Sequence, residues 1–395
     1  MSWIALQMLT GDRAKFLGIV MGLTFTALLI TQQGSIFCGL MLRTASQITD
    51  TTGADLWVMD SNVLHVDDVK PMIQNNIYRV RGVDGVKWAV PFFKGQARAK
   101  VDNVNGTPRQ VIEQVVLLGL DDSSMVGAPP PNKILEGKLE DLRRPDAIFI
   151  DYTRLSKLFP GLPAVAYTKG EAHRFLGKEI EMNDHRAIIV GVCEASRTFQ
   201  SNPVVYTTYS RAKFYAPSER KVLSYILAKT DEGRDPDEVA ASIRRQTGLG
   251  ALTGPQFVAK TINYFMKYTG IPINFGITAC LGFLVGTAIA GQTFYNFTLE
   301  NLKQFGALKA MGATNFMIVR MIMLQATVVG FLGYGIGTGL AALFGERTKG
   351  GELAFYTPWQ LLPITAVAVV MICIVASLIC IRKVIVLEPA VVFRG

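Results

Sequence analysis

Residues that could carry out chemistry are few in this sequence, and they form no familiar catalytic or metal-binding pattern. The histidines His65, His173 and His185 show no close metal spacing, and neither H-E-x-x-H nor a G-x-S-x-G nucleophile turn occurs. The adjacent acids Asp67 and Asp68 could form an acid–base couple, but neighbouring acids in a polar stretch are usually solvated surface. We therefore expect binding or docking from this region, and no catalytic residue.

The five cysteines lack the spacing of a metal site or of a disulfide framework. Cys38, Cys280, Cys373 and Cys380 lie in apolar stretches, and only Cys193 lies outside them. We interpret all five as small apolar packing residues, and we expect no metal site and no cofactor bound by this chain.

A glycine-rich run from Gly330 to Gly339 resembles a nucleotide-binding loop in composition. It lies within an apolar stretch, however, and lacks the Lys-Ser/Thr pair of a P-loop. Two overlapping small-x-x-x-small patterns, Gly333/Gly337 and Gly335/Gly339, predict close packing of helices, within the chain or between copies. The printed sequence has no Walker motif, so any ATP and Mg²⁺ would be bound by a partner ATPase.

The segment 300–316 is the most informative part of the sequence. It predicts a short amphipathic helix, because Phe305, Leu308 and Met311 recur at i, i+3 and i+6 beside Lys303 and Lys309. Such a helix could lie on a membrane surface, or it could dock into the groove of a partner protein.

Charge-free stretches set the architecture around these segments. Half of the 395 residues are hydrophobic and only 18% are charged, whereas soluble domains carry roughly a quarter charged residues. Each of four stretches without Asp, Glu, Lys or Arg exceeds the roughly 20 residues that a helix needs to cross a bilayer: Phe16–Leu42, Tyr268–Leu299, Met321–Gly345 and Leu353–Ile381. The first is too long for the core of a signal peptide, so we expect an uncleaved helix. No charge lies deep in any stretch, which argues against an ion-coupled transporter.

The basic residues of the short connecting segments predict the orientation. With the N-terminus in the cytoplasm, the cytoplasmic segments hold more basic than acidic residues. The acidic residues are Asp12, Glu300 and Glu388. The basic residues are Arg13, Lys15, Lys303, Lys309, Arg320, Arg382, Lys383 and Arg394. The short loop before the last stretch is balanced. Both termini are therefore expected inside and the large segment 43–267 outside, and the net charge of +9 requires no nucleic-acid partner.

The large outer segment reads as a mixed α/β domain. Strands are expected at 55–59, 110–120, 204–209 and 224–228, and a hairpin at 179–192 around the turn pair Asn183-Asp184. A helix is expected to begin after Asp235, with Pro236 in its first turn and Glu238 completing a capping box, and to end at Gly248. Ala128-Pro-Pro-Pro131 is expected to be a loop.

The predicted fold is an α-helical membrane protein with four transmembrane helices and a large α/β extracytoplasmic domain inserted between helices 1 and 2. Aromatic residues are expected at its membrane interfaces, namely Tyr264, Phe265, Tyr268, Tyr356 and Trp359. Polar residues in Thr31-Gln-Gln-Gly-Ser35 are expected to hydrogen-bond between helices or to face a substrate. The expected boundaries are 1–42 for the N-terminal segment and first span, 43–262 for the outer domain, 263–299 for the second span, 300–316 for the connector, 317–345 for the third span, 346–357 for the outer loop, 358–381 for the fourth span and 382–395 for the tail.

The sequence resembles the FtsX/MacB-type permeases of ABC transporters, also called type VII. Their connector commonly reads R-E-I-G-x-x-x-A-x-G-A, and Lys303-Gln-Phe-Gly-Ala-Leu-Lys-Ala-Met-Gly-Ala313 matches its frame. The glycine-rich third span, the closing Leu387-Glu-Pro389 and the order of the spans also resemble the family. Two features depart from it: Lys303 and Gln304 replace the common Arg-Glu, and the fused ATPase of MacB is missing. Leu9–Arg13, Gln32–Gly34 and Asp55–Val58 are similar to the stand-alone DevC-like permeases of glycolipid-type exporters.

The resemblance implies a homodimer in a bacterial inner membrane that binds a cytoplasmic ABC ATPase subunit. The connector would be the coupling helix, with contacts from Lys303, Gln304, Phe305, Gly306, Leu308, Lys309, Gly312 and Ala313. It also implies mechanotransmission of ATPase motion to the periplasmic domain, where an adaptor (membrane fusion) protein would dock, and contact with membrane lipids. Export in a tripartite assembly is one implied role. Lipoprotein release and FtsX-like control of a cell-wall hydrolase are the alternatives, and the size of the outer domain favours the first two.

Overall fold

The computed structural model describes residues 2–102, 110–160, 162, 167–217, 222–348 and 352–385, which belong to two compact units. The first, here called the membrane unit, comprises Met1–Leu40 and Gly270–Gly395, and the second, the outer unit, comprises Met41–Thr269. The predicted closing segment Leu387-Glu-Pro389 lies outside the described residues.

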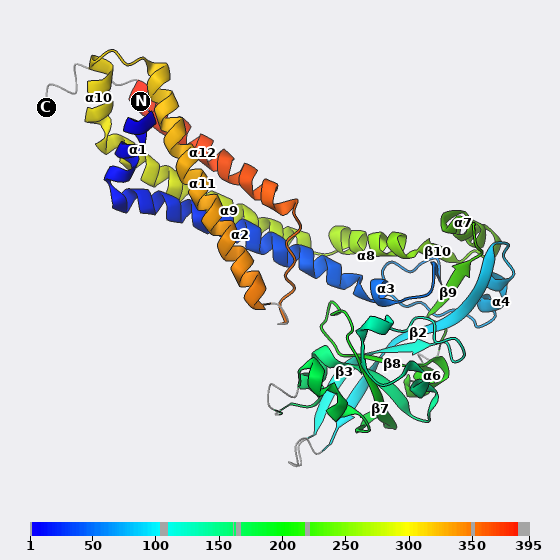
Figure 1. Ribbon diagram of the computed structural model, residues 1–395. Helices are drawn as coiled ribbons and strands as arrows, with labels where there is room; N and C mark the ends of the chain where they lie inside the picture. The colour runs from blue at the N-terminus through cyan, green and yellow to red at the C-terminus, as the bar shows by residue number, and fades with distance from the viewer. Residues whose placement is uncertain are drawn as a thin grey trace. The chain divides into compact units, whose positions relative to one another are not determined.

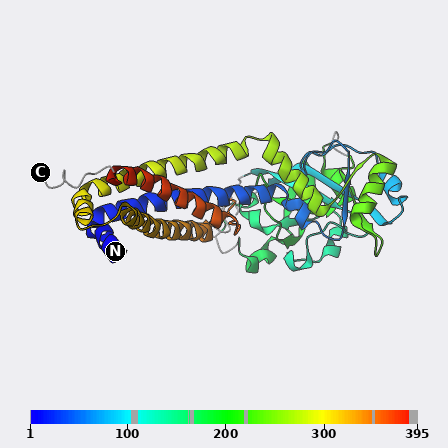
Figure 2. The ribbon, with the colours of Figure 1, turned by 90° about the horizontal axis from the view of Figure 1, so that it is seen from above.

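The membrane unit is built from helices alone in its described part: α1 (Ser2–Gly11), α2 (Arg13–Thr44), α9 (Ile271–Glu300), α10 (Leu302–Ala310), α11 (Asn315–Thr348) and α12 (Leu361–Ile385). Four of them, α2, α9, α11 and α12, are long and apolar enough to cross a membrane, as the charge-free stretches predicted. In two views these four run alongside one another, with α1 and α10 at the same end of the bundle (Figures 1 and 2).

Both apolar and polar contacts hold the membrane helices together. One core joins all six helices, including Leu9, Leu23, Phe294, Phe305 and Ile372. Within it, Thr31 and Thr365 share a hydrogen bond of 3.2 Å, Ser35 and Thr357 share one of 2.7 Å, and Gln325 donates to the Ala5 carbonyl at 2.8 Å. Thr31 therefore joins α2 to α12, which is one of the two roles that its position in the first span predicted, and Ser35 joins α2 to the segment before α12.

The outer unit contains two lobes that share one long strand, β2 (Val86–Val101). In the first lobe the strand order is β10-β1-β9-β2, and all neighbours are antiparallel. Its elements follow one another as two strand–helix–strand units: β1 (Leu56–Met59), α4 (Asn76–Arg81) and β2, then β9 (Tyr225–Thr230), α7 (Pro236–Thr247) and β10 (Gly250–Thr253). This is the split βαβ arrangement of ferredoxin-like folds.

Alternation along β1 shows how the first lobe buries both faces of its sheet. Leu56 and Val58 belong to one core together with Val239 of α7, whereas Trp57 and Met59 belong to a second core. The second core also contains α3 (Ser46–Asp50) and α8 (Gly254–Tyr268), which pack on each other. Because successive side chains of a strand point to opposite faces, a sheet covered on both sides has a nearly continuous apolar strand.

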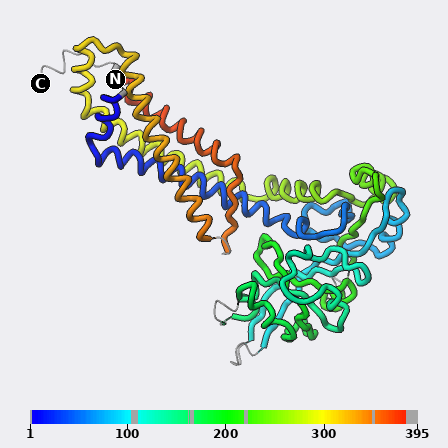
Figure 3. The backbone as a smooth tube through the Cα atoms, in the orientation of Figure 1, coloured from blue at the N-terminus to red at the C-terminus, as the bar shows by residue number. Residues whose placement is uncertain are grey.

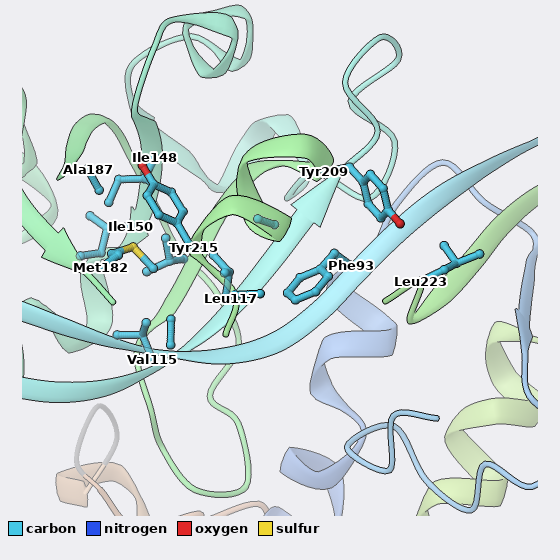
Figure 4. Packing of buried hydrophobic residues seen from close by; sticks show 14 of the residues in the cluster. Phe93, Val115, Leu117, Ile148, Ile150, Met182, Ala187, Tyr209, Tyr215 and Leu223 are labelled. Atoms are coloured by element: carbon cyan, nitrogen blue, oxygen red, sulfur yellow. The ribbon is translucent and has the colours of Figure 1, made fainter. Parts of the chain in front are cut away.

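The second lobe is inserted between β2 and β9 and closes into a ring of strands. The C-terminal half of β2 pairs with β3 (Val111–Leu120), and the ring continues through β8 (Val204–Thr208), β5 (Ala147–Asp151), β7 (His185–Cys193) and β6 (Glu179–Met182) back to β2. The short β4 (Ile134–Glu136) pairs with β7. Among the described residues, helices α5 (Leu155–Leu158) and α6 (Tyr209–Tyr215) and four short 3-10 turns complete the lobe. The turns are Pro131–Lys133, Leu139–Arg143, Tyr152–Arg154 and Lys169–Phe175. Figure 4 shows its packed interior, and the tube in Figure 3 traces β2 into it.

The predicted elements of the outer unit are largely confirmed. All expected strands are present within two residues of their expected ends, and the hairpin turns at Asn183 and Asp184, both with positive φ (46° and 66°). The Asp235 side chain accepts a hydrogen bond from the Asp237 N–H, and α7 stops at Gly248, whose φ is 73°. The structure caps this helix through Asp235 and gives Glu238 no part in it. Ala128–Pro130 has no regular structure and leads into a 3-10 turn.

Two expectations about the second span differ from the structure. The expected boundary between residues 262 and 263 falls inside α8, and the membrane-length helix begins only at Ile271. Tyr264, Phe265 and Tyr268 belong to α8 and not to the second span. Tyr264 and Phe265 stack on His65, with ring centroids 4.5 and 5.3 Å away. The aromatic rings of Tyr264 and Phe265 therefore contribute to packing within the outer unit.

Candidate functional site

The connector between α9 and α11 is a separate helix with a defined stop. Asn301 ends α9, and its side chain donates to the Phe297 carbonyl at 2.8 Å. At the other end of α10, the Ala313 N–H donates to the Leu308 carbonyl at 2.9 Å, with Gly312 between them at a φ of 96°. This is the Schellman arrangement, which needs a residue that tolerates positive φ. Gly312 therefore fixes the angle at which the chain leaves the connector.

The apolar series that predicted this helix faces the interior of the membrane unit. Phe305 is fully buried and Leu308 is nearly so, both in the core shared with α1, α9 and α11. Gly306 is buried as well, and Lys309 and Ala313 are half-buried. Phe305, Gly306 and Leu308 therefore cannot contact a partner protein in this conformation, which corrects the contact set implied by the resemblance.

The exposed surface of the connector is made by other residues. Lys303, Gln304 and Gly312 are exposed, as predicted for contact residues, and Met311 and Phe316 are 76% and 78% exposed. We call Lys303, Gln304, Met311, Gly312 and Phe316 the connector face. Phe316 was missed although it lies at the end of the expected connector 300–316, because only Phe305, Leu308 and Met311 fitted the apolar series of the expected helix. The available signal for Phe316 was its position shortly after Gly312, the glycine that ends the connector helix.

An ion pair holds the end of α9 against the start of α2. The ammonium group of Lys15 pairs with Glu300 and, at 2.7 Å, with Asp12. Both carboxylates come from the small set of acids expected on the cytoplasmic side. Because the pair is partly exposed, its contribution to stability is modest, but it fixes where the connector starts.

The four packing glycines separate into two pairs. A Cβ atom on Gly337 would come within 2.5 Å of the Thr24 carbonyl oxygen, and one on Gly333 within 2.5 Å of the Leu23 Cβ. These two therefore lie directly against α2. Gly335 and Gly339 face the other way and have no described heavy atom within 4 Å of such a Cβ position.

The Asp67-Asp68 pair has structural partners, and Asp67 nevertheless lies on the surface as expected, with 47% of its side chain exposed. Asp67 pairs with the buried ammonium group of Lys94, which also donates to the Val66 carbonyl at 2.9 Å. Asp68 accepts from the Leu64 N–H at 3.0 Å and pairs with Lys70 at 3.0 Å. Desolvation lowers the pKa of Lys94, although Asp67 opposes that shift. A charged group as deeply buried as Lys94 requires such a partner.

A buried carboxylate joins the residues that follow α2 to the ring lobe. Asp50, at the end of α3, accepts hydrogen bonds from Lys133 Nζ at 2.7 Å and from Ser196 Oγ at 2.8 Å. Its other oxygen accepts from the Ser196 N–H at 2.5 Å. Asp50 therefore connects α3 to the segment after β7 and to the turn before β4.

A second buried carboxylate, Asp151, makes the stability of the outer unit depend on pH. Desolvation raises its pKa from 3.8 to about 6, although Thr153 and Ala195 donate hydrogen bonds to it. The folded state keeps the Asp151 carboxyl group protonated up to a higher pH than the unfolded state does. The resulting contribution to the free energy of unfolding is therefore present below about pH 4 and is lost as pH rises to about 6. The loss amounts to about 3 kcal/mol. In Asp151→Asn, we expect the free energy of unfolding of residues 41–269 to lose this slope and to exceed that of the wild type at pH 7.5.

Urea unfolding at pH 4, 5, 6 and 7.5 measures this effect. Asp84→Asn is the matched control, because the Asp84 side chain is 83% exposed. A pH slope that survives in Asp151→Asn, or that disappears equally in Asp84→Asn, would assign the slope to other groups.

Comparison with known proteins covers both units. The MacB-like periplasmic core domain model matches residues 16–246, and the FtsX-like permease C-terminal model matches residues 276–389. An uncharacterised ABC transporter permease of Mycobacterium bovis is 25% identical over 236 residues, which cover 60% of this chain and 62% of that protein. One from Methanocaldococcus jannaschii is 25% identical over 191 residues, 45% of this chain and 47% of the relative. The chain thus spans about three fifths of the length of the first curated relatives it matches.

Two solved structures are also similar to the chain. The extracellular domain of the noncanonic ABC-type transporter YknZ from Gram-positive bacteria is 15% identical, with 51% of this chain and 98% of that chain covered and a TM-score of 0.33. The periplasmic region of MacB from Actinobacillus actinomycetemcomitans is 13% identical, with 56% and 96% covered and a TM-score of 0.35. The family assignment depends on the sequence models, of which the MacB-like one alone takes in more than half of the chain. With its four membrane-length helices and its α/β outer unit, the chain belongs to the FtsX/MacB-type permeases of ABC transporters.

Proposed function

We propose that this permease is the membrane subunit of an ABC exporter and that it receives its motion through the connector face from a separate cytoplasmic ATPase. The exposure of Met311 and Phe316 carries this proposal. Large apolar side chains that are exposed next to the end of a helix are typical of a surface that a partner covers. In this scheme the buried side of α10, with Phe305 and Leu308, holds the connector rigidly to the bundle.

The orientation in this proposal follows from the basic residues. Lys303 and Lys309 lie in the connector and Arg13 and Lys15 lie at the start of α2, which supports a position of the connector and both termini in the cytoplasm of a bacterium. The outer unit is then periplasmic. An adaptor protein would dock there, and ATP with Mg²⁺ would remain on the ATPase.

The route of the motion starts with the ATPase and ends in the outer unit. A push on α10 moves α9 and α11, because the three share one core. The α2 helix packs on α11 through Gly333 and Gly337, and Asp50 follows six residues after the end of α2. The Asp50 contacts then pass the displacement to the ring lobe. This scheme moves the outer unit without a substrate path through the bundle, and it suits lipid or glycolipid export in a tripartite assembly.

Co-purification tests the proposal. The double variant Met311→Asp/Phe316→Asp should retain its fold and lose at least nine tenths of the ATPase that co-purifies with tagged wild-type chain, because two carboxylates replace the apolar contacts. Ile73→Asp is the matched control, since Ile73 is also an exposed apolar residue (67%) but lies in the outer unit. Full ATPase retention by the double variant would remove the connector face from the interface.

The proteins recovered with the wild type separate export from its alternatives. An ATPase with an adaptor supports the export assembly. An ATPase with a cell-wall hydrolase supports a signalling permease instead, and an ATPase with lipidated cargo supports lipoprotein release. Recovery of no ATPase contradicts all three.

A further inference from the structure

Along one edge of the long strand β2 the neighbouring strand changes from β9 to β6, and a gap separates the two. On this edge β9 pairs with residues Val86–Phe92, and β6 pairs only with Ala99 and Lys100. The opposite edge is occupied by β3 from Phe93 to Val101. Between Phe93 and Arg98, the first edge therefore has no strand beside it in the described part of the chain.

Two side chains close the ends of this gap. The Lys94 N–H donates to Ser224 Oγ at 3.1 Å, and the Ser224 hydroxyl also contacts the Lys94 carbonyl at 3.1 Å. At the other end, the Arg98 N–H donates to Asn183 Oδ1 at 2.9 Å, and the Asn183 N–H donates to the Arg98 carbonyl at 2.9 Å. Lys94 and Arg98 thus direct their main-chain groups away from β3.

The residue between them, Gln96, must direct its main-chain groups to the same edge, because these groups alternate along a strand. The orientation of Val116, the residue opposite Gln96 on β3, supports this: its N–H donates to the Pro203 carbonyl at 2.8 Å and so faces away from β2. The described residues provide no hydrogen-bond partner for the N–H or the C=O of Gln96 on this edge. An extended chain would supply both.

Two hollows flank Gln96 along the gap. The first has a volume of about 430 Å³ and is lined by Phe93, Val69, Pro71 and Val116 together with Lys94, Asp67, Asp68 and Ser224. The second, of about 200 Å³, is lined by Gln96, Ala97, Arg98, Gln114, Asn183 and Pro217. Gln96 lines both hollows, so they follow one another along the strand edge.

The charges of the two hollows differ. In the first, Lys94 is neutralised by Asp67 and Asp68 is paired with Lys70, so an uncharged apolar group fits against the part of the wall that Val69, Pro71 and Phe93 provide. The second contains the exposed Arg98, and none of its described lining residues is a carboxylate. An acidic group complements the positive charge of Arg98 on that surface.

We propose that the gap binds an extended peptide segment of a partner protein by strand addition to β2. The segment pairs with the N–H and C=O of Gln96, places an apolar side chain in the larger hollow and places an acidic side chain beside Arg98. Main-chain hydrogen bonds supply affinity in this mode of recognition, and the pockets on either side supply specificity. This site is independent of the connector and of the ATPase.

Binding of blocked pentapeptides to the full chain in lipid nanodiscs tests the proposal. The probes are acetyl-Ala-Leu-Ala-Asp-Ala-amide and its reversed order, each with a fluorescent label, because the direction of the added strand is open. Fluorescence anisotropy should show saturable binding of at least one of them. Gln96→Pro, which removes the main-chain N–H at an edge without a strand, should weaken binding at least tenfold. Gln96→Ala is the matched control, which keeps the N–H and should bind within twofold of wild type.

Two further arms keep the test decisive if Gln96→Pro does not fold. A peptide N-methylated at its central Ala should bind the wild-type chain at least tenfold more weakly, because its own N–H is blocked. Arg98→Glu should weaken the Asp peptide at least fivefold and leave the corresponding Asn peptide within twofold. Absence of binding by both peptide orders, or equal binding of the N-methylated and unmodified peptides, would overturn the proposal.

Discussion

Phe305→Asp is expected to abolish the folded membrane unit and not merely to release the ATPase. The Phe305 side chain is fully buried among residues of α1, α9 and α11. Truncating a buried phenylalanine costs about 3–5 kcal/mol, and a carboxylate without a partner in the same place adds several more. The sum approaches or exceeds the whole stability of a typical domain, which is about 5–15 kcal/mol.

Size-exclusion chromatography of the tagged full chain in detergent measures this outcome. Phe305→Asp should elute as aggregate or be lost during expression, whereas Phe305→Leu should elute as the wild type does. Met311→Asp, a similar change at an exposed position on the same helix, should also elute normally. If Phe305→Asp gave a well-folded chain without ATPase, Phe305 would belong to the partner interface after all.

The sequence predicted the connector as a helix but assigned its apolar face to the wrong partner. Periodicity shows that Phe305, Leu308 and Met311 share one side of a helix, yet it does not tell whether that side meets the same chain or another one. The structure divides the series, since Phe305 and Leu308 enter the chain's own core and Met311 does not. Only the tertiary arrangement of α1 and α11 around α10 decides this.

The membrane helices were predictable because the bilayer imposes a simple rule on composition. A long charge-free stretch is rare by chance, and all four such stretches became membrane-length helices. The exception is the start of the second span. Tyr264, Phe265 and Tyr268 look like an interfacial belt in the sequence, but Thr269 and Gly270 separate their helix from α9. The short break carries too little signal to be recognised without the structure.

The longest strand of the outer unit was missed for a physical reason. β2 contains Pro91, Gly95 and the charged residues Lys94, Arg98 and Lys100, which interrupt the usual pattern of a strand. Two of them are tolerated for local reasons: β3 pairing starts only at Phe93, beyond Pro91, and Lys94 is neutralised by Asp67. The inward-facing residues in its second half are the small Ala97 and Ala99, which give a weak hydrophobic signal. A strand that serves two lobes thus loses the regularity by which strands are recognised.

Gly337→Leu is expected to destabilise the membrane unit by about 3 kcal/mol, since overpacking against rigid neighbours costs this much. A Cβ atom at this position would lie 2.5 Å from the Thr24 carbonyl oxygen and 2.9 Å from the Leu28 N. These are main-chain atoms of α2, so a side-chain rotation cannot relieve the contact and the whole helix must move. Because small residues allow helices to approach closely in a membrane, the loss extends to the surrounding packing.

Gly339→Leu separates this packing effect from the effect of adding a leucine to α11. Gly339 lies two residues further along the helix, and no described atom lies within 4 Å of its Cβ position. Thermal unfolding of the full chain in detergent should show a midpoint about 10 °C lower for Gly337→Leu and nearly unchanged for Gly339→Leu. Equal shifts would show that the α2–α11 contact is not limiting. Native mass spectrometry of the Gly339→Leu chain adds a second result: if a second copy packs on the outward-facing glycines, this variant should be monomeric while its unfolding midpoint stays high.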